Sequence, residues 1–455
     1  MLGARTTLSS CVEALEGGAL SSAALVEGCL EKIAESAGEG ARAFLHVDAD
    51  RAQLEAKYYD DCRKAGVRFP RFAGIPIAIK GNIDMAGHVT TAGSRVLVGS
   101  PPAAQDALVV SRLRAAGFIC LGRTNMTEFA YSGLGLNPHY GTPLNPYGRD
   151  SGHIPGGSSS GTAVAVADGM AIAGLGTDTG GSCRIPAAWC GLTGFKPSSA
   201  RVSKQGVYPL SNTLDAVGPI GQSVSCCAAL DAVMSGAGMP AKGCSAISPM
   251  SLKGLRIAVS KTVMLDRCSI AVARAFERAL TSLSNRGAII HEVAFDSIGS
   301  LADVNAKGGF AAAEAYAHLR ALLTSQQDAF DPRVASRILR GAEQDAADYI
   351  DLTNARIALI ADFTHALEPF DCLIAPTVPV QAPTLRDVDD DASYAQLNLL
   401  ALRNPSVANF FDCPSISTPI ESENQMPVGL MIIGKNMEDT GLFKSAAAIE
   451  AALAQ

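Results

Sequence analysis

The chain has 455 residues, of which 48% are hydrophobic and 18% are charged, and its formal net charge is −7. This balance is typical of a protein with a large buried core and excludes a disordered chain. The negative charge argues against a nucleic-acid partner, which would require a basic surface. Length alone favours two or three domains, because single cores rarely exceed roughly 300 residues.

We expect no membrane segment, no signal peptide and no metal site. Residues 163–175 are apolar but shorter than the about 20 residues that a membrane span needs, and Asp168 interrupts them. Residues 1–5 are not followed by the apolar core of a signal peptide. The 12 cysteines form no C-x-x-C pair, disulfide framework or metal-ligand spacing. Free thiols in a reducing, cytoplasmic compartment are therefore expected.

The N-terminal part of the chain predicts helices followed by a buried strand. Residues 1 to about 60 are predicted to be helical, and Ser21 or Ser22 can cap a helix whose apolar residues recur at helical spacing. The apolar run FAGIPIAI at residues 72–79 predicts a buried strand. Lys80 follows this strand directly, so its ammonium group is expected at the strand's end.

The next elements alternate between helix and strand. Residues 106–116 predict a helix, and residues 118–122 a short strand after one glycine. A helix that leads into a strand in this way favours an α/β fold. Residues 131–146 are rich in Gly, Asn and Pro and predict an irregular segment.

Two glycine-rich turns with hydroxyl groups stand in the middle of the chain. Residues 156–161 read GGSSSG and residues 176–182 read GTDTGGS. Glycine allows a positive φ or the close approach of another group. The small apolar residues 162–175 between the turns predict a buried helix. Since flexible linkers rarely flank a buried helix, we interpret the two turns as a preorganised site.

The C-terminal half predicts further strands and helices without a chemical motif. Residues 252–259, 269–283 and 288–293 predict a strand, an amphipathic helix and a strand, which implies a parallel pair with a right-handed crossover. Residues 297–366 are predicted to be mainly helical. Two more strand candidates are residues 371–376 and 427–433.

The central stretch resembles the amidase signature family. Residues 156–161 match its GGSS-x-G motif. Residues 176–197, GTDTGGSCRIPAAWCGLTGFKP, match G-[ST]-D-x-G-G-S-x-R-x-P-A-x-x-C-G-x-x-G-x-K-P. Weaker similarities at residues 374–379 and 404–406 extend the resemblance, which covers residues from about 10 to 450.

The resemblance implies the α/β fold class, as a single α/β/α domain in which helices cover both faces of a large mixed, twisted sheet. It therefore overrules the domain number that length favours. The resemblance assigns residues 1–455 to this one domain. They comprise N-terminal helices (about 1–65), a catalytic core (about 66–225), and the rest of the sheet with the substrate-pocket helices (about 226–455).

The resemblance also implies catalytic roles for Lys80 as the base, Ser158 as the bridging serine and Ser182 as the nucleophile. In the family, the bridging serine follows a cis peptide bond. The residues themselves agree with these roles, because a serine nucleophile needs a base, and burial lowers the pKa of a lysine by up to about 3–5 units. For an isolated lysine, a snorkelling strand-end position would be the commoner case.

The turn before the nucleophile offers backbone donors. Thr179, Gly180, Gly181 and Ser182 supply four consecutive N–H groups, which predict an oxyanion hole. Asp178 is expected to organise this turn through Asx-type hydrogen bonds.

Three further residues are candidates for substrate binding: Met126, Glu128 and Arg184. A position beside the core is the alternative for the first two, and a structural ion pair for the third, since arginine suits both. The chain departs from the family at two non-catalytic positions. Gly81 replaces an aspartate that usually follows the lysine, and Cys183 replaces an isoleucine or valine.

Two competing motifs are excluded. Residues 157–161 fit the G-x-S-x-G nucleophile elbow, but the elbow requires a preceding strand and residues 150–155 predict none. A phosphate-binding P-loop requires a lysine after its second glycine, where Thr162 follows Gly161.

The resemblance implies a serine amidohydrolase that converts a small-molecule carboxamide to a carboxylate and ammonia or an amine. It implies an acyl-enzyme on Ser182 and no cofactor. The alternative is the glutaminase subunit of a tRNA-dependent amidotransferase complex. Residues 127–133 read TEFAYSG, unlike the DEFAMGSS-like wording of that subunit. The amide, the leaving group and the oligomeric state, a homodimer included, stay open.

Overall fold

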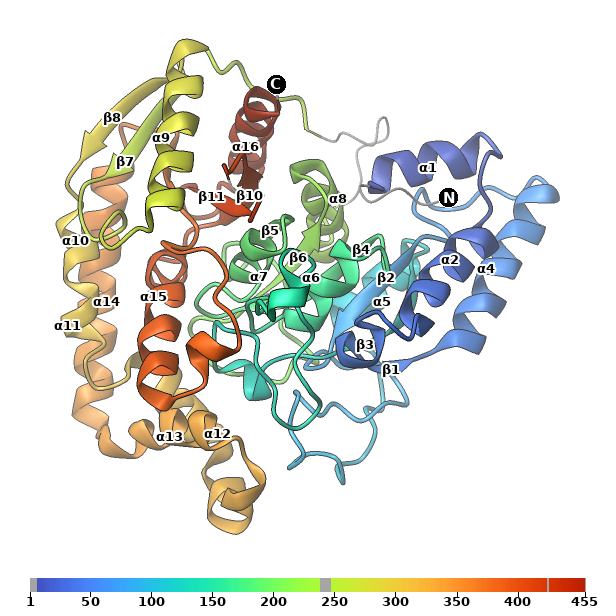
Figure 1. The fold of residues 1–455 in the computed structure, drawn as a ribbon, viewed down its shortest axis with the longest axis horizontal. Coiled ribbons are helices and arrows are strands. Elements are labelled where there is room, and N and C mark those ends of the chain that lie inside the picture. Colours follow the sequence, from blue (N-terminus) through green and yellow to red (C-terminus); the bar gives the residue numbers. More distant parts are fainter. Residues whose placement is uncertain (1–5, 238–246, 424, 455) are drawn as a thin grey trace.

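One mixed β-sheet runs through the computed structural model, which describes residues 6–237, 247–423 and 425–454 (Figure 1). Within these residues the sheet has 11 strands in the order β1-β3-β2-β4-β6-β5-β10-β11-β9-β7-β8. β2 and β7 are parallel to both of their neighbours, and the other pairs are antiparallel. The strands are β1 (Phe44–Val47), β2 (Pro76–Lys80), β3 (Ile119–Thr124), β4 (Ala173–Asp178), β5 (Thr193–Lys196), β6 (Ala216–Gly221), β7 (Arg256–Ser260), β8 (Ile289–Val293), β9 (Cys372–Pro376), β10 (Ser415–Ile420) and β11 (Val428–Ile433).

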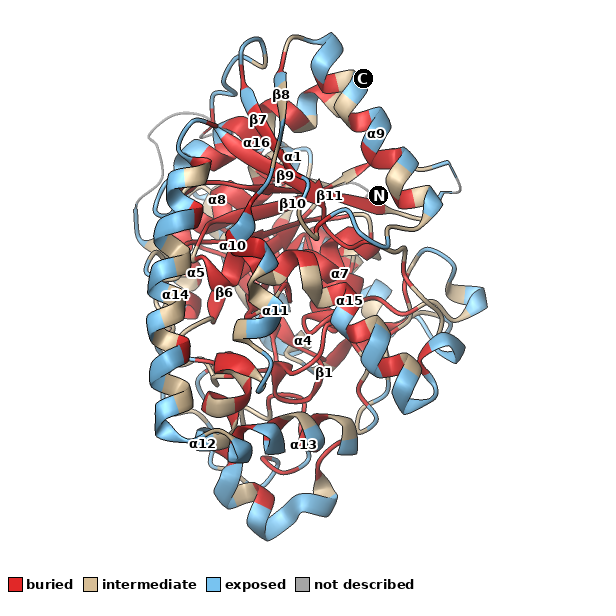
Figure 2. Ribbon diagram, turned by 90° about the vertical axis from the view of Figure 1, so that its left-hand side faces the viewer, coloured by how far each residue is buried: buried red, intermediate tan, exposed pale blue. Residues whose placement is uncertain are grey.

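Helices cover both faces of this sheet. One face packs against α1, α5, α8, α9 and α16, and the other against α4, α6, α7, α10, α14 and α15. Figure 2 shows the buried residues concentrated in the strands, while α9 and α14 expose their outer sides. The predicted fold class is confirmed. The helices are α1 (Leu8–Glu16), α2 (Ser22–Ala34), α3 (Gly40–Ala43), α4 (Ala49–Lys64), α5 (Leu108–Ala115), α6 (Ser160–Ala167), α7 (Arg184–Trp189), α8 (Val224–Ser235), α9 (Ile270–Asn285), α10 (Asp296–Gly299), α11 (Leu301–Val304), α12 (Gly309–Gln326), α13 (Pro332–Leu339), α14 (Ala346–Leu367), α15 (Asp391–Phe410) and α16 (Asp439–Leu453).

The sheet consists of two halves that follow the order of the chain. Strands β1 to β6 form one half and β7 to β11 the other, and among the described strands the two halves meet where β5 pairs with β10. In Figure 1 the first half lies with α2 and α4, and the second with α9 and α14. The antiparallel pairing at the junction places Phe195 opposite Ile416 and Lys196 opposite Ser415.

Several local predictions are confirmed. Ser21 caps α2, because its side chain accepts a hydrogen bond from the Ala24 N–H. The predicted strand, amphipathic helix and strand correspond to β7, α9 and β8, and the two strands are parallel. The short strand β1, which pairs with β3 at the edge of the sheet, was not predicted.

The prediction of one buried helix over residues 162–175 is wrong. α6 ends at Ala167, and β4 already begins at Ala173. Gly169, at φ 74°, lies just beyond the helix in the left-handed region that favours glycine and stops helices. Both elements are buried on all sides, so the apolar run carries no period that separates helix from strand.

Side chains on β2 alternate between the two faces of the sheet, as in any strand. Ile77 and Ile79 contact the cluster that contains α1, α5 and α8, whereas Ala78 packs with α6. Lys80, two residues after Ala78, therefore projects to the side of α6. This is also the side on which residues 156–161 lead into α6.

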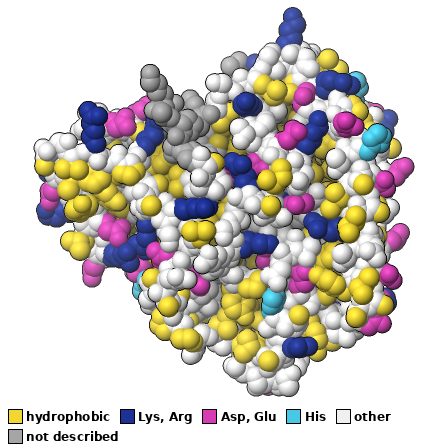
Figure 3. Space-filling view, turned by 180° about the vertical axis from the view of Figure 1, so that it is seen from behind, with side chains coloured by type: hydrophobic (Ala, Val, Ile, Leu, Met, Phe, Trp, Pro, Cys, Tyr) yellow, Lys and Arg dark blue, Asp and Glu magenta, His cyan; other side chains and the backbone are white. Residues whose placement is uncertain are grey.

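None of the helices in the described residues is long and apolar enough to cross a membrane. On the face that Figure 3 shows, lysine and arginine side chains are interspersed with acidic and apolar ones. The described cysteines are free thiols, as expected. Cys244 lies outside the described residues.

Candidate active site

Lys80 ends β2 with a fully buried side chain. Its Nζ atom lies 2.7 Å from Ser158 Oγ and 2.8 Å from Thr177 Oγ1. Desolvation lowers the pKa of Lys80 to about 8, although the nearby carboxylates of Asp178 and Asp215 oppose this shift. A lysine with such a pKa is partly neutral near pH 7 and can accept a proton.

Ser158 lies in the turn that precedes α6. The peptide bond between Gly157 and Ser158 is cis. The Ser158 carbonyl accepts a hydrogen bond of 3.1 Å from the Thr127 N–H, and the Ser159 N–H donates one of 3.3 Å to the Ser182 carbonyl. The second of these bonds places the turn beside Ser182. The structure thus brings together the segments that carry Lys80, Ser158 and Ser182.

The Asp178 carboxylate organises the backbone of the turn before Ser182. Asp178 accepts hydrogen bonds from the N–H groups of Gly181 (2.8 Å) and Cys183 (3.0 Å). The Asx-type role that the sequence predicts for Asp178 is confirmed. Gly181 has a φ of 127°, and an added Cβ would lie 2.6 Å from Pro405 Cβ, so only glycine fits there.

This arrangement divides the four predicted oxyanion donors into two groups. The Gly181 N–H is used within the turn by Asp178. The N–H groups of Thr179, Gly180 and Ser182 have no acceptor among the hydrogen bonds of the described residues. Backbone N–H groups left free beside a nucleophile can bind the oxygen of a tetrahedral intermediate. Three donors, rather than four, are therefore available for that purpose.

Arg184 lies in a buried ion pair with Asp178. Its Nε and Nη2 atoms donate to the two carboxylate oxygens at 3.1 Å and 2.9 Å, and Nη1 donates to the Pro405 carbonyl at 2.9 Å. Nη2 also donates to Asn409 Oδ1 at 2.7 Å. Burial would raise the pKa of Asp178, but Arg184 and Asn409 hold it well below its usual range. The structure therefore places Arg184 in the structural ion pair, the second of its two predicted roles.

Removing this cation should destabilise the fold strongly. Arg184→Met leaves the Asp178 carboxylate buried without its partner, which costs about 3–5 kcal/mol of unfolding free energy. The measurement is the urea concentration at the midpoint of unfolding. Arg51→Met is the matched control, because Arg51 is half exposed in its pair with Glu55. Its loss should cost at most about 1 kcal/mol. An Arg184→Met midpoint equal to that of the Arg51→Met variant would contradict this account.

Met126 and Glu128 are fully buried, and Met126 packs in a hydrophobic cluster with Ala92, Val96 and Leu97. The Glu128 carboxylate accepts hydrogen bonds from Ser94 Oγ (2.6 Å) and the Asp331 N–H (2.7 Å), and it lies 2.9 Å from His139 Nε2. Burial raises the pKa of Glu128. Both side chains are thus part of the protein interior, and a direct contact of either with substrate stays a prediction.

Lys196 shows that a low pKa alone does not identify a base. This lysine, at the end of β5, is also buried, and desolvation lowers its pKa to about 8. Its Nζ atom donates to the Pro197 carbonyl at 2.7 Å and to no serine hydroxyl of the described chain. Lys80 differs because its nitrogen contacts the hydroxyl of Ser158. Geometry, rather than pKa, separates the two.

Sequence reasoning missed several supports of the site. Thr177 Oγ1 accepts hydrogen bonds from both Lys80 and Asn82, the second at 3.2 Å. Thr177 lies within the motif of residues 176–197, and this position could have marked it as part of the site. Asn409, on α15, donates to the Asp178 carbonyl at 3.0 Å. Nothing near Asn409 in the sequence marks it, although residues 404–406 belong to the weaker similarities.

Comparisons with known proteins cover nearly the whole chain. Residues 24–443 match the protein-family model described as Amidase. The chain is 34% identical to a glutamyl-tRNA(Gln) amidotransferase subunit from Symbiobacterium thermophilum, over 94% of this chain and 93% of that one. It is 30% identical to 2-amino-5-chloromuconic acid deaminase of Comamonas testosteroni, over 100% of this chain and 98% of that one.

Among solved structures, the chain is similar to a crystal structure described as an amidase. The two are 30% identical, with a TM-score of 0.88, and the match covers 98% of this chain and 100% of the other. The comparisons of sequence and of structure therefore agree, and each of them covers nearly the whole chain.

Proposed function

The chain belongs to the amidase signature family, whose members act on amide C–N bonds, and on this premise we propose that it hydrolyses the carboxamide of a small molecule. The products are a carboxylate and ammonia or an amine, and the intermediate is an acyl-enzyme on Ser182. One observation carries this proposal. The buried Lys80 Nζ lies 2.7 Å from Ser158 Oγ, in a turn whose next residue is hydrogen-bonded to Ser182.

In the first step, Ser182 Oγ attacks the carbonyl carbon of the amide. Its proton passes to Ser158 Oγ, while the Ser158 proton passes to neutral Lys80. The carbonyl oxygen gains a negative charge, which the free N–H groups of Thr179, Gly180 and Ser182 stabilise. A base of pKa about 8 is suited to this transfer, because efficient general bases have pKa values near the working pH.

In the second step, the tetrahedral intermediate collapses and the C–N bond breaks. The proton held on Lys80 returns through Ser158 to the leaving nitrogen, which departs as neutral ammonia or amine. Water then attacks the ester carbonyl and gives its proton to the same pair. The C–O bond to Ser182 breaks, Ser182 Oγ takes this proton back from the pair, and the acid leaves as a carboxylate after losing its remaining proton to solvent. Each proton that Lys80 accepts is thus released within the cycle.

Two candidate roles follow from the relatives. Similarity to 2-amino-5-chloromuconic acid deaminase supports a small-molecule substrate whose nitrogen is lost as ammonia. Similarity to the glutamyl-tRNA(Gln) amidotransferase subunit supports the alternative of a glutaminase that works in a complex. The two roles differ in whether the chain acts alone.

The purified chain should release ammonia from simple carboxamides without any partner. The assay is a panel of aryl, indoleacetic and short aliphatic amides, with glutamine included, in which ammonia and the carboxylate are both quantified. We expect stoichiometric release of both products from at least one small amide. Hydrolysis of glutamine alone, and only after a partner protein is added, would support the glutaminase role and contradict the first one.

A further inference from the structure

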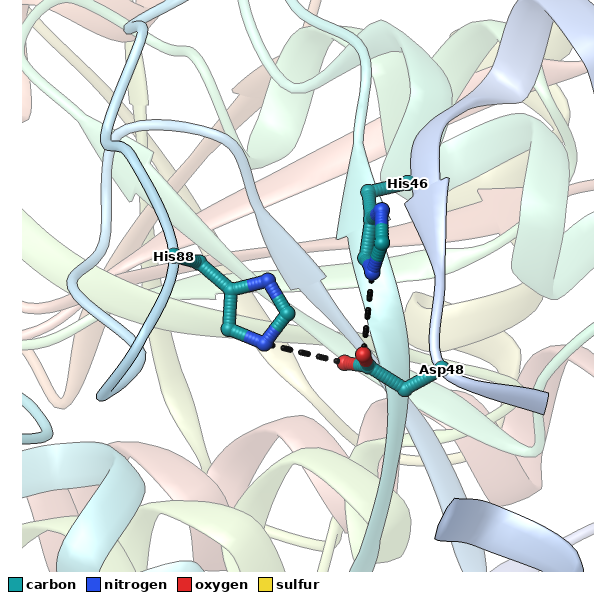
Figure 4. Close-up of side chains that lie close together, drawn as sticks. All are labelled: His46, Asp48 and His88. Atoms are coloured by element: carbon teal, nitrogen blue, oxygen red, sulfur yellow. Dashed lines mark hydrogen bonds and ion pairs between the residues drawn. The ribbon is translucent and has the colours of Figure 1, made fainter. Parts of the chain in front are cut away.

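A cluster of two histidines and one aspartate lies outside the candidate active site, at the edge of the sheet (Figure 4). His46 belongs to β1, Asp48 follows that strand at the start of α4, and His88 comes from the loop after β2. Residues two apart on an extended chain point to the same side. This spacing directs His46 and Asp48 to one side, and the loop brings His88 to meet them.

The three side chains converge with their ligand atoms. His46 Nε2 lies 2.9 Å from Asp48 Oδ1, and His88 Nε2 lies 3.5 Å from Asp48 Oδ2. In Figure 4 both Nε2 atoms point at the carboxylate. One ligand atom from each residue lies within 4.8 Å of the other two. Around a tetrahedral zinc ion with bonds of about 2.0–2.2 Å, ligand atoms are about 3.4 Å apart. A small rotation of the half-exposed His46 would meet this requirement.

The behaviour of Asp48 is independent of this geometry and points the same way. Asp48 occupies the N-cap position of α4, where aspartate usually accepts a hydrogen bond from the first turn. Its side chain makes no such bond. It turns towards the histidines instead, and its buried Oδ2 atom has no hydrogen-bond partner. Without the cap bond, the Oδ2 atom faces His88 Nε2 at 3.5 Å and makes no hydrogen bond, so it can serve as a metal ligand.

The backbone on both sides of the cluster is fixed before any ligand binds. The Asp48 N–H donates to the Leu121 carbonyl at 2.8 Å. The His88 N–H donates to the Met85 carbonyl at 3.1 Å, and the His88 carbonyl accepts from the Ala103 N–H at 2.8 Å. Only side-chain rotations are then needed to form the site, which lowers the entropic cost of binding.

We infer that His46, Asp48 and His88 form a binding site for a divalent transition-metal ion such as Zn²⁺ or Co²⁺. Two imidazoles and a carboxylate suit such ions rather than Ca²⁺ or Mg²⁺, which prefer oxygen ligands. The ion would join β1 and α4 to the loop that follows Lys80. It would stabilise this edge of the sheet and take no part in the hydrolysis, so the inference is independent of the proposed function.

Zinc binding to the untagged chain tests the inference. Equilibrium dialysis at near-neutral pH, followed by metal analysis, should give one bound Zn²⁺ per chain. At zinc concentrations about 100-fold above Kd, the unfolding temperature should rise by about 2–5 °C. His46→Ala and His88→Ala should each weaken binding by about tenfold or more and cut the rise by about half or more. Asp48→Asn keeps the shape of the side chain but lacks its charge, and should behave in the same way.

His365→Ala is the matched control, because His365 is exposed and also lies near a carboxylate, 3.7 Å from Glu368. The His365→Ala variant should bind zinc as tightly as the wild-type chain does. Circular dichroism of each variant without metal checks that it is folded. Wild-type binding in the His46→Ala and His88→Ala variants, or no zinc bound by the wild type at millimolar zinc, would overturn the inference.

Discussion

Ser182→Ala is expected to abolish amide hydrolysis, with kcat lowered by about 10⁵-fold or more, as for other serine nucleophiles. The change removes only Oγ. The Ser182 carbonyl still accepts the hydrogen bond from Ser159, and Asp178 still holds the turn. The fold should therefore be intact. Ammonia release and covalent labelling by a fluorophosphonate measure the loss, and both should disappear.

Ser159→Ala is the control for this variant. Ser159 is buried in the neighbouring turn, and its hydroxyl donates a long hydrogen bond of 3.4 Å to the Thr177 carbonyl. Labelling should persist in this variant. Labelling that survives in Ser182→Ala and vanishes in Ser159→Ala would instead identify Ser159 as the nucleophile of an elbow motif.

Lys80→Ala and Lys80→Arg are both expected to lower kcat by about 10²–10⁴-fold, the range for loss of a general base, and to change KM much less. Alanine removes the base, and arginine cannot give up its proton. Steady-state kinetics on the best amide of the panel gives the comparison. A Lys80→Arg enzyme with near-normal kcat would show that the residue acts only through its positive charge, and the Lys80–Ser158–Ser182 mechanism would then fail.

The pH profile gives a second test of the same residue. Because the base must be neutral, activity should rise with pH up to the Lys80 pKa of about 8 and level off above it. At pH 7 only about a tenth of the molecules would carry the neutral lysine. Lys196→Gln should keep this rise, although Lys196 has a similar pKa, whereas Lys80→Ala should lose it.

The parts of the fold that could be predicted from the sequence are those with a local period. α9 shows helical spacing, and the strands β7 and β8 beside it each contain a short apolar stretch, so all three were predicted. Residues 162–175 have no usable period, because every side of α6 and β4 is buried, and the prediction failed there. β1 has four residues, and its half-exposed His46 interrupts the apolar pattern. Such strands are defined by their neighbours in the sheet rather than by their own sequence.

The residues of the candidate site also divide into those that a local sequence pattern reveals and those that depend on distant parts of the chain. Lys80, Ser158 and Ser182 could be selected because their motifs are contiguous, and the structure places their segments together. The role of Arg184 could not be decided, since its partners at Pro405 and Asn409 lie more than 200 residues away in the chain. Which backbone N–H groups of the turn stay free depends on the position of the Asp178 carboxylate. Only the folded backbone determines that position.

The junction between β5 and β10 has a consequence for biosynthesis. β5 ends at Lys196 and β10 begins at Ser415, and at roughly 5–20 residues per second the ribosome needs on the order of 10 to 40 seconds to make the chain between them. During this interval the edge of β5 lacks its partner strand, and Arg184 lacks Asn409. Unpaired strand edges recruit other chains. The nascent protein thus carries all three proposed catalytic side chains before the strand that joins the two halves of the sheet has been made, and the free edge of β5 is open to other chains during this interval.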